Sequence, residues 1–441
     1  MRNRIAFVPL LAGASFLVAC GGAAGLPTVS PTDIPALEAG VAAAPEDADR
    51  LTLLGVAYYN AGRHEDAIGV LRRAVALEAA PAVAHLHLGL AHEALRQWQQ
   101  ASDAYAAFLS ASPADSDVRQ DIQQRVVLVE RELMHEQLRA MLAQEEALAN
   151  QAAQPRTVAV FPFRIVAEDP RYEPLQYALA DMVTTDLSIP GSLRLLERAQ
   201  IQALVQEMAL TLAGFTDASS AARVGRLMRA QHVVQGSVVL LGDEQLRMEM
   251  AVVDPAQAAR SGEAADETPL EQIFDAEKQL VLEILDVLGV TLTDAEREAI
   301  EENRTSSLLA LLAYGEGLDA MDRGDFAAAT SAFQNASSMD PGFQAAQARA
   351  QEASGLQQAS ETSGSEIAAA AQSDLPGAPT QETTVAMVDQ IIPDINRSGA
   401  DGLAGADQPG NDPAHEDQVS NDVAQTCGPI CLPINIRNPN Q

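Results

Sequence analysis

The chain of 441 residues is poor in basic and aromatic side chains, and it has only three cysteines. Acidic residues outnumber basic ones by 61 to 28, the formal net charge is −33, and Lys278 is the only lysine. Because a polyanion repels nucleic acid and anionic lipid surfaces, we do not expect binding to either through a basic surface. The lysine lies in the sequence DAEKQLV, without a preceding glycine-rich turn, so a phosphate-binding loop of the GxxxxGK type is absent.

The sequence also lacks the combinations of residues that catalysis or metal binding requires. Three histidines cluster in HLHLGLAH, but His85 and His87 lie about 200° apart around a helix and do not share a ligand site. The serines have no glycine elbow and no evident histidine partner. We therefore expect no catalytic residue, no metal site and no cofactor. An enzyme would instead be indicated by a pocket with convergent titratable groups in the middle of the chain.

The first residues have the pattern of an export signal. A basic start precedes an apolar run over residues 5–18, which is shorter than the about 20 residues of a membrane-spanning helix. The sequence LVAC at residues 17–20 resembles the lipobox of bacterial lipoproteins. In that family the cysteine is lipidated, so the resemblance implies a signal peptide over residues 1–19 and a lipid on Cys20. The alternative is an ordinary secretory signal with a chance cysteine.

Two segments are rich in small and polar residues. Residues 20–45 contain much Ala, Gly and Pro, and we interpret them as a tether. Residues 355–441 are acidic and polar, and we expect disorder because they bury too little apolar surface to offset the entropy of ordering. Near the end, Cys427 and Cys431 flank Gly-Pro in TCGPICLP, which favours a small disulfide loop over two free thiols in an exported protein.

Helical repeats follow the tether. Two segments align with a period of 34 residues, with Gly55 over Gly89, and this is the period of the tetratricopeptide repeat. The alignment resembles that family and predicts two repeats, each of two antiparallel helices, over residues 46–114. The small residues are expected to let the paired helices approach closely.

Two further helical regions are predicted. Residues 115–154 have apolar positions at helical spacing and predict one long helix. That helix either caps the repeats, which we favour, or pairs in a coiled coil. Residues 310–343 fit the repeat template again, and we predict a helix plus a third repeat over residues 292–354. A lone repeat needs a neighbour to complete its core.

Residues 155–291 alternate between strand and helix signals. TVAVFPF is rich in β-formers, and HVVQGSVVLL and LRMEMAVV predict a hairpin. The predicted fold class is therefore an α/β central domain, with a mixed sheet and helices, flanked by all-α tetratricopeptide-repeat helices and followed by a disordered C-terminal tail.

The segments VAVFPF, LLERAQIQALVQEM, AARVGRLMRAQHVVQGSVV and MEMAVVD resemble the periplasmic domain of CsgG-type curli-export lipoproteins and the related N-terminal domain of TolB. Glu197 and Arg198 of the LLER turn are interpreted as a structural pair at the strand–helix corner. In the curli channel, long hairpins inserted into this domain make the pore, one of them between the two strands that the short turn GDEQ joins here. The resemblance therefore implies the periplasmic platform without the pore.

Together these features predict a non-enzymatic, lipid-anchored scaffold or adaptor of a cell-envelope assembly or export complex, in the outer membrane and facing the periplasm. The repeats are expected to bind proteins or peptides of the envelope in their groove, and the membrane is reached through the N-terminal lipid. The alternative is a non-pore-forming or partner-completed subunit of a curli-type outer-membrane secretion channel. No nucleic-acid partner is expected, and a homo-oligomer is left open. Candidate partner-binding residues are Tyr58, Tyr59, Asn60, His87 and Glu93.

Overall fold

The computed structural model describes residues 29–376, apart from 115, 117, 149–150, 209–217, 243–244, 303–304 and 306. All of them belong to the first of the chain's two units, and the second unit begins at Gln381. The predicted signal peptide over residues 1–19, the lipidation of Cys20 and the disulfide between Cys427 and Cys431 lie outside the described residues.

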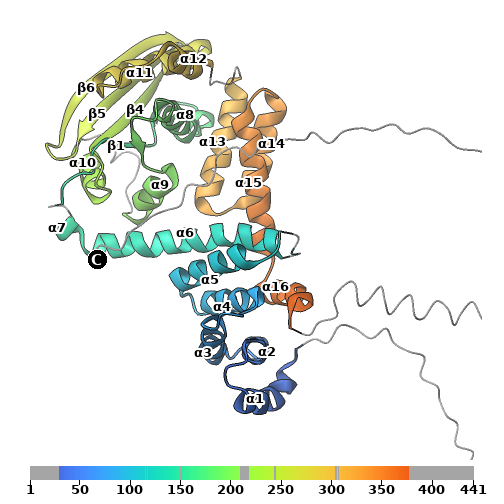
Figure 1. Cartoon of the computed structure of the whole chain (residues 1–441). Helices are drawn as coiled ribbons and strands as arrows, with labels where there is room; N and C mark the ends of the chain where they lie inside the picture. The colour runs from blue at the N-terminus through green and yellow to red at the C-terminus, as the bar shows by residue number, and fades with distance from the viewer. Residues whose placement is uncertain are drawn as a thin grey trace, which may run out of the picture. The chain divides into compact units, whose positions relative to one another are not determined.

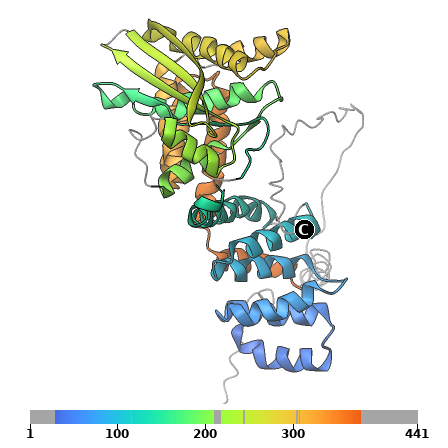
Figure 2. The same ribbon diagram turned by 90° about the vertical axis from the view of Figure 1, so that its left-hand side faces the viewer.

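The N-terminal part of the described chain consists of short helices (Figure 1; Figure 2): η1 Pro31–Asp33, α1 Ile34–Ala43, α2 Ala48–Asn60, α3 His64–Val75, α4 Ala82–Ala94 and α5 Trp98–Ala111. Helix α2 packs on α3, and α4 packs on α5. A Cβ atom at Gly55 would lie 2.4 Å from Leu71 Cγ, and one at Gly89 would lie 2.5 Å from the ring of Tyr105. Only glycine allows this approach, as the repeat alignment predicted.

Helix α1 occupies part of the predicted tether. Val41 is buried, and Ile34 and Leu37 pack beside it against the first repeat. The tether prediction is therefore wrong for residues 31–43. The three apolar side chains share one helix face and gain enough contact with α2 to order the segment, although the surrounding Ala, Gly and Pro are typical of a linker.

Helix α6 (Arg119–Ala143) is the long helix that the sequence predicted. It packs against α5, and its first turn together with Val118 completes the core of the second repeat, where Ile122 is fully buried. The capping interpretation is therefore confirmed. Farther along, α6 contacts α9 (Arg198–Glu207) and α15 (Gln344–Glu361), so it touches both the middle domain and the C-terminal helices.

A mixed sheet forms the middle domain (Figure 1), with strands β1 Thr157–Val160, β2 Arg164–Val166, β3 Arg194–Leu195, β4 His232–Leu241, β5 Gln245–Asp254 and β6 Ala259–Pro269. The strand order is β3-β1-β4-β5-β6, and β2 also pairs with β4. Strand β1 is parallel to β3 and β4, β2 is parallel to β4, and β4, β5 and β6 are antiparallel neighbours. The α/β prediction with antiparallel strands added is confirmed.

Sequence analysis missed the edge strand β6. Its apolar content is low, and Ala264 and Thr268 are its buried residues, yet it pairs with β5 from Pro269 back to Ala259. The pairing depends on backbone hydrogen bonds to β5, which no side-chain pattern reveals. Charged side chains such as exposed Glu263 protect an edge strand from pairing with another chain.

Helices cover the two faces of the sheet unequally (Figure 1). Helices α8 (Leu175–Ser188) and α11 (Ile273–Val287) pack on one face, against central side chains such as Met248. Helix α9 and helix α10 (Ala218–Leu227) cover part of the opposite face around Phe161. The shorter elements of this region are α7 Glu145–Leu148, η2 Pro170–Tyr172 and η4 Leu270–Gln272.

The C-terminal helices are α12 Asp294–Glu302, α13 Leu308–Arg323, α14 Phe326–Met339, α15 Gln344–Glu361, α16 Gly364–Ala370 and η5 Ala371–Asp374. The α13–α14 pair has the repeat packing, since a Cβ atom at Gly317 would lie 2.5 Å from the ring of Phe333. Helix α8 packs on α13 and helix α15 packs on α14, so the third repeat has neighbours on both sides. None of the helices in the described ranges is long and apolar enough to cross a bilayer.

The disordered tail was predicted to begin at residue 355, which is too early in the chain. Residues 355–376 are mostly helical, and Leu356, Ile367 and Leu375 are buried. The disorder prediction is therefore wrong for this stretch. Its few large apolar side chains are widely spaced, and Ile367 and Leu375 are buried in a cluster with residues of α2 and α4, which lie far away in the sequence.

The only lysine belongs to a buried charged cluster between α8 and α11. Lys278 Nζ lies 2.5 Å from Asp186 Oδ2 and 3.1 Å from Glu277 Oε2, and all three residues are buried. Burial, followed by the neighbouring Asp186 carboxylate, raises the pKa of Glu277 from 4.5 to about 8. Glu277 is therefore protonated at neutral pH, and Lys278 forms its ion pair with the Asp186 carboxylate.

Glu277→Gln is expected to reduce the pH dependence of stability. Between its unfolded and folded pKa values, the folded chain binds one proton more than the unfolded chain. The free energy of unfolding therefore falls with rising pH, by up to about 1.4 kcal/mol per pH unit. Urea unfolding across this window should give a flatter profile for Glu277→Gln. The exposed Glu283→Gln on the same helix should keep the wild-type slope, and identical slopes for both variants would contradict the assignment.

Candidate interaction site

An apolar surface, which we call the docking surface, crosses the two N-terminal repeats. It is formed by Val56 of α2, by Val83, Leu86 and Leu90 of α4, and by Ile122 of α6. Helices α2 and α4 contact each other, and each is the first helix of its repeat. This is the part of the repeats that the sequence analysis assigned to partner binding.

The chain's own residues 363–375, which we call the docked segment, occupy this surface (Figure 1). They form α16 and η5 and contact α4. Gly364 lies so close to the first repeat that a Cβ atom there would be 2.8 Å from the Tyr59 hydroxyl oxygen. The side chains that the docked segment buries in the same apolar cluster are Ile367, Ala368, Ala371 and Leu375.

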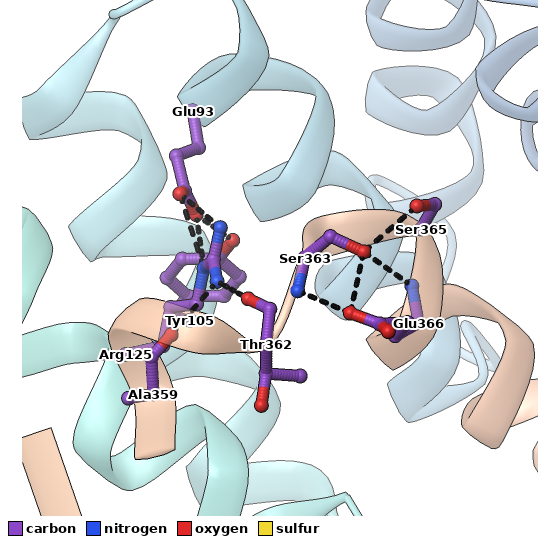
Figure 3. Close-up of polar contacts among 8 residues, drawn as sticks. All are labelled: Glu93, Tyr105, Arg125, Ala359, Thr362, Ser363, Ser365 and Glu366. Carbon is purple, nitrogen blue, oxygen red and sulfur yellow. Dashed lines mark hydrogen bonds and ion pairs between the residues drawn. The ribbon is translucent and has the colours of Figure 1, made fainter. Parts of the chain in front are cut away.

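A capping box starts the docked segment (Figure 3). Glu366 N donates a hydrogen bond to Ser363 Oγ at 3.2 Å, and Ser363 N donates one to Glu366 Oε2 at 2.6 Å. These bonds satisfy amides that a helix start leaves without partners. Helix α16 has seven residues, too few for stability in isolation, so its contacts with the docking surface keep it folded.

Arg125 of α6 joins the second repeat to the end of α15 (Figure 3). Its Nη2 lies 2.6 Å from Glu93 Oε1, and its Nη1 donates to Thr362 O at 2.5 Å and to Ala359 O at 3.3 Å. Glu93 also accepts a hydrogen bond of 2.6 Å from the Tyr105 hydroxyl. Burial and the Glu93 carboxylate raise the pKa of Tyr105 well above its ordinary value, so this hydroxyl stays protonated and donates.

Of the five predicted partner-binding residues, Tyr59 contacts the docked segment at Gly364, Glu93 binds Arg125, and His87 is buried beside Tyr59. The rings of Tyr59 and His87 meet edge to face with their centroids 5.8 Å apart, and Glu93 pairs with Arg125. His87 is fully buried, and its Nδ1 lies 3.0 Å from Val83 O. Burial lowers the pKa of His87 to about 4, so the ring is neutral and acts as a packing residue.

The other two predicted residues contact the N-terminal segment. The Tyr58 hydroxyl donates to Glu38 Oε1 at 2.6 Å, and Arg63 lies over the Tyr58 ring at 4.2 Å. Asn60 Nδ2 donates to Val29 O at 2.8 Å. Both side chains therefore hold residues that the sequence analysis placed in the tether, and neither faces the docked segment's apolar side.

Sequence analysis missed Arg125 and the whole docked segment. One local signal for the segment was present, because Ser363 and Glu366 have the spacing of a capping box ahead of Ile367. No local signal existed for Arg125, since its partners come from two separate parts of the chain.

A second open surface lies on the CsgG-resembling domain, on the sheet face opposite α8 and α11. Residues from the middle of β4, β5 and β6 border a hollow of about 500 Å³ on this face. Arg247 Nε lies 2.8 Å from Glu249 Oε1, and both side chains are exposed. The lining also includes Arg164, Ser237 and Glu263.

Ion pairs fix the middle domain against the third repeat. Arg198 Nη1 lies 2.6 Å from Asp322 Oδ2, and its Nε lies 3.4 Å from Asp181 Oδ1. The Tyr314 hydroxyl donates to Asp181 Oδ2 at 2.8 Å. The interpretation of Glu197 and Arg198 as a pair is therefore wrong: Glu197 is exposed, while the Arg198 side chain reaches between α8 and α13 and is 11% exposed.

Comparison with known proteins agrees with these two parts of the fold. Residues 140–250 match the family model of the curli production assembly/transport component CsgG, and residues 51–82 match a tetratricopeptide-repeat model. The chain contains a CsgG-like domain and a tetratricopeptide repeat. The CsgG match begins in α6 and ends in β5, so β6 and α11 lie beyond it.

Matches to whole proteins are limited. No curated protein matches the chain. Among solved structures, the chain is similar to the LpoB C-terminal domain from Salmonella enterica, with 14% sequence identity and a TM-score of 0.22. That similarity covers 31% of this chain and 94% of the LpoB domain.

Arg125→Ala is expected to destabilise the chain by about 3 kcal/mol, because it leaves the half-buried Glu93 carboxylate and the α15 carbonyls without their partner. Urea unfolding measures the loss. Arg63→Ala is the matched control, since Arg63 pairs with Asp66 at an exposed site, and it should destabilise the chain much less than Arg125→Ala. Equal effects of the two substitutions would show that the Arg125 contacts do not stabilise the fold.

His87→Leu is expected to make the stability of the folded chain less sensitive to acid. The unfolded chain protonates His87 at its ordinary pKa of 6.5, while the folded chain resists protonation down to about 4. Stability therefore falls as the pH decreases through this window, by up to about 1.4 kcal/mol per unit. His87→Leu should flatten the profile in thermal or urea unfolding. His85→Leu, at a half-buried position of the same helix, should change it less, and a larger effect there would refute the assignment.

Proposed function

We propose that the chain is a non-enzymatic scaffold or adaptor of the cell envelope, anchored in the outer membrane by a lipid on Cys20 and facing the periplasm. Its docking surface and its CsgG-like domain bind protein partners of an envelope assembly or export complex. The tetratricopeptide repeat and the CsgG-like domain both support a role in protein interaction at the envelope.

The observation that carries this proposal is the helix on the docking surface. Residues 363–375 lie against α4 and beside Tyr59 of α2, and they bury Ile367, Ala368, Ala371 and Leu375 in the shared apolar cluster, much as grooves accept the apolar side of an amphipathic helix. A surface that accepts a helix of this chain has the shape and apolar character to accept a helix of a partner.

The CsgG-like domain supplies a second surface and a rigid support. Its uncovered sheet face carries exposed charged side chains around a hollow of about 500 Å³, which favours polar contacts with a protein partner. The ion pairs of Arg198 with Asp181 and Asp322 hold this domain against the third repeat. A partner bound at the sheet would therefore be placed at a set position relative to α13.

The alternative function is a subunit of a curli-type secretion channel, and the match to the CsgG model favours it. The connection between β4 and β5 counts against it, because β4 ends at Leu241 and β5 begins at Gln245. A strand that spans a membrane needs about 9–11 residues, and this turn adds no such strand. Pore strands would have to come from other subunits.

Native mass spectrometry of the full-length protein, extracted from membranes with mild detergent, tests the proposal. We expect a monomer or dimer that retains a different envelope protein, and an N-terminal peptide whose mass includes a lipid on Cys20. The matched variant Cys20→Ala should appear in the soluble fraction without the lipid mass.

Two results would contradict the proposal. A closed ring of many identical copies would favour the secretion channel. An unmodified Cys20 in a protein that leaves the membrane on washing with salt would refute the lipid anchor.

A further inference from the structure

The docked segment is held to the docking surface by modest contacts. Ile367 and Leu375 are its large buried side chains, and the remaining buried apolar residues of the segment are alanines. Its polar contacts include Val29 N donating to Gln372 Oε1 at 3.2 Å and Ser116 Oγ donating to Asp374 Oδ2 at 3.3 Å. Both distances are at the long end for hydrogen bonds, so neither bond fixes the segment strongly.

The chain on the two sides of Ser363 is held differently. Arg125 binds the carbonyl oxygens of Ala359 and Thr362, which precede the docked segment. If the segment leaves the docking surface, these bonds and the Glu93 ion pair remain in place. The link between Thr362 and Ser363 therefore separates a helix end that Arg125 holds from a segment whose described residues accept no hydrogen bond from Arg125.

Departure of the segment would make the docking surface accessible, and the segment's own buried side chains show the pattern that another occupant has to match. Ile367 lies in α16, Ala371 lies in η5 and Leu375 directly follows η5, and all three side chains are buried. At the start of the segment, the Tyr59 hydroxyl leaves room only for a glycine at position 364 unless its ring moves. An occupant must match both features.

We propose that the docked segment is an internal competitor, which covers the docking surface until a partner helix displaces it. The partner presents a short, mostly helical segment with branched apolar side chains at the positions of Ile367 and Leu375, an alanine at that of Ala371, and a glycine near Tyr59. This inference rests on the proposed function, because it takes the docking surface as the partner-binding site.

The test uses the full chain and a labelled synthetic peptide of residues 363–375, SGSEIAAAAQSDL. Ile367→Asp places a charge in the apolar contact and releases the chain's own segment, whereas Ala369→Asp changes an exposed position of the same helix. Fluorescence anisotropy gives the Kd of the peptide for each variant. We expect the peptide to bind Ile367→Asp at least about tenfold more tightly than the wild type. In the wild type the chain's own segment occupies the docking surface and weakens the apparent affinity for the peptide, and Ile367→Asp removes this competition. Ala369→Asp should match the wild type.

Hydrogen exchange on the wild-type chain supplies a second readout, which holds even if Ile367→Asp fails to fold. Amides of α16 should exchange through local opening while those of α4 remain protected. The proposal is overturned if α16 and α4 open together, or if the peptide binds the folded Ile367→Asp and Ala369→Asp variants equally. A wild-type dimer whose docked segments are exchanged between copies would also overturn it, in favour of a second copy as the occupant.

The outcomes separate this inference from the proposed function. If native mass spectrometry finds no envelope partner but the peptide binds Ile367→Asp tightly, the internal competition stands and the adaptor role fails. If a partner is found but the peptide does not bind, the partner uses another surface, and the internal competitor is refuted.

Discussion

Two arginines of α6 join the described parts of the chain by binding carbonyl oxygens at the ends of other helices. The last carbonyls of a helix have no partner within it and carry partial negative charge, so a guanidinium group is well suited to them. Arg125 binds Ala359 O and Thr362 O at the end of α15. Arg131 donates to Met321 O at 2.6 Å and to Asp322 O at 2.5 Å, at the end of α13.

These contacts determine where the interaction surfaces lie. Arg125 fixes the end of α15 next to Glu93 of the second repeat, and the chain that leaves this point reaches the docking surface directly. Near Arg131, the side chain of Asp322 pairs with Arg198 of the CsgG-like domain. Helix α6 thus caps the repeats, anchors the third repeat and contacts the sheet domain through α9, which places both candidate partner surfaces on one connected framework.

The parts of the fold that follow from patterns of nearby residues were predictable from the sequence. The 34-residue period located Gly55 and Gly89, and both glycines have the close contacts that the period implies. The hairpin of β4 and β5 followed from its β-branched residues and its turn. Strand β6 and helix α1 were missed because their stability comes from β5 and α2, and their own residues are mostly polar or small. Tyr59 contacts the docked segment, Glu93 pairs with Arg125 and His87 is buried, so their assignment to partner binding stays a prediction, whereas Arg125 was not predicted.

The sequence by itself determined the repeats, the α/β domain and the short β4–β5 turn, because periodicity and turn residues act over a few positions. Only the tertiary structure decided what covers the docking surface and which carboxylates Arg198 and Lys278 pair with. The bond from Arg125 to Thr362 joins residues 237 positions apart, and the raised pKa of Glu277 depends on burial beside Asp186 of another helix. Such contacts form when distant segments pack together, and no local pattern contains them.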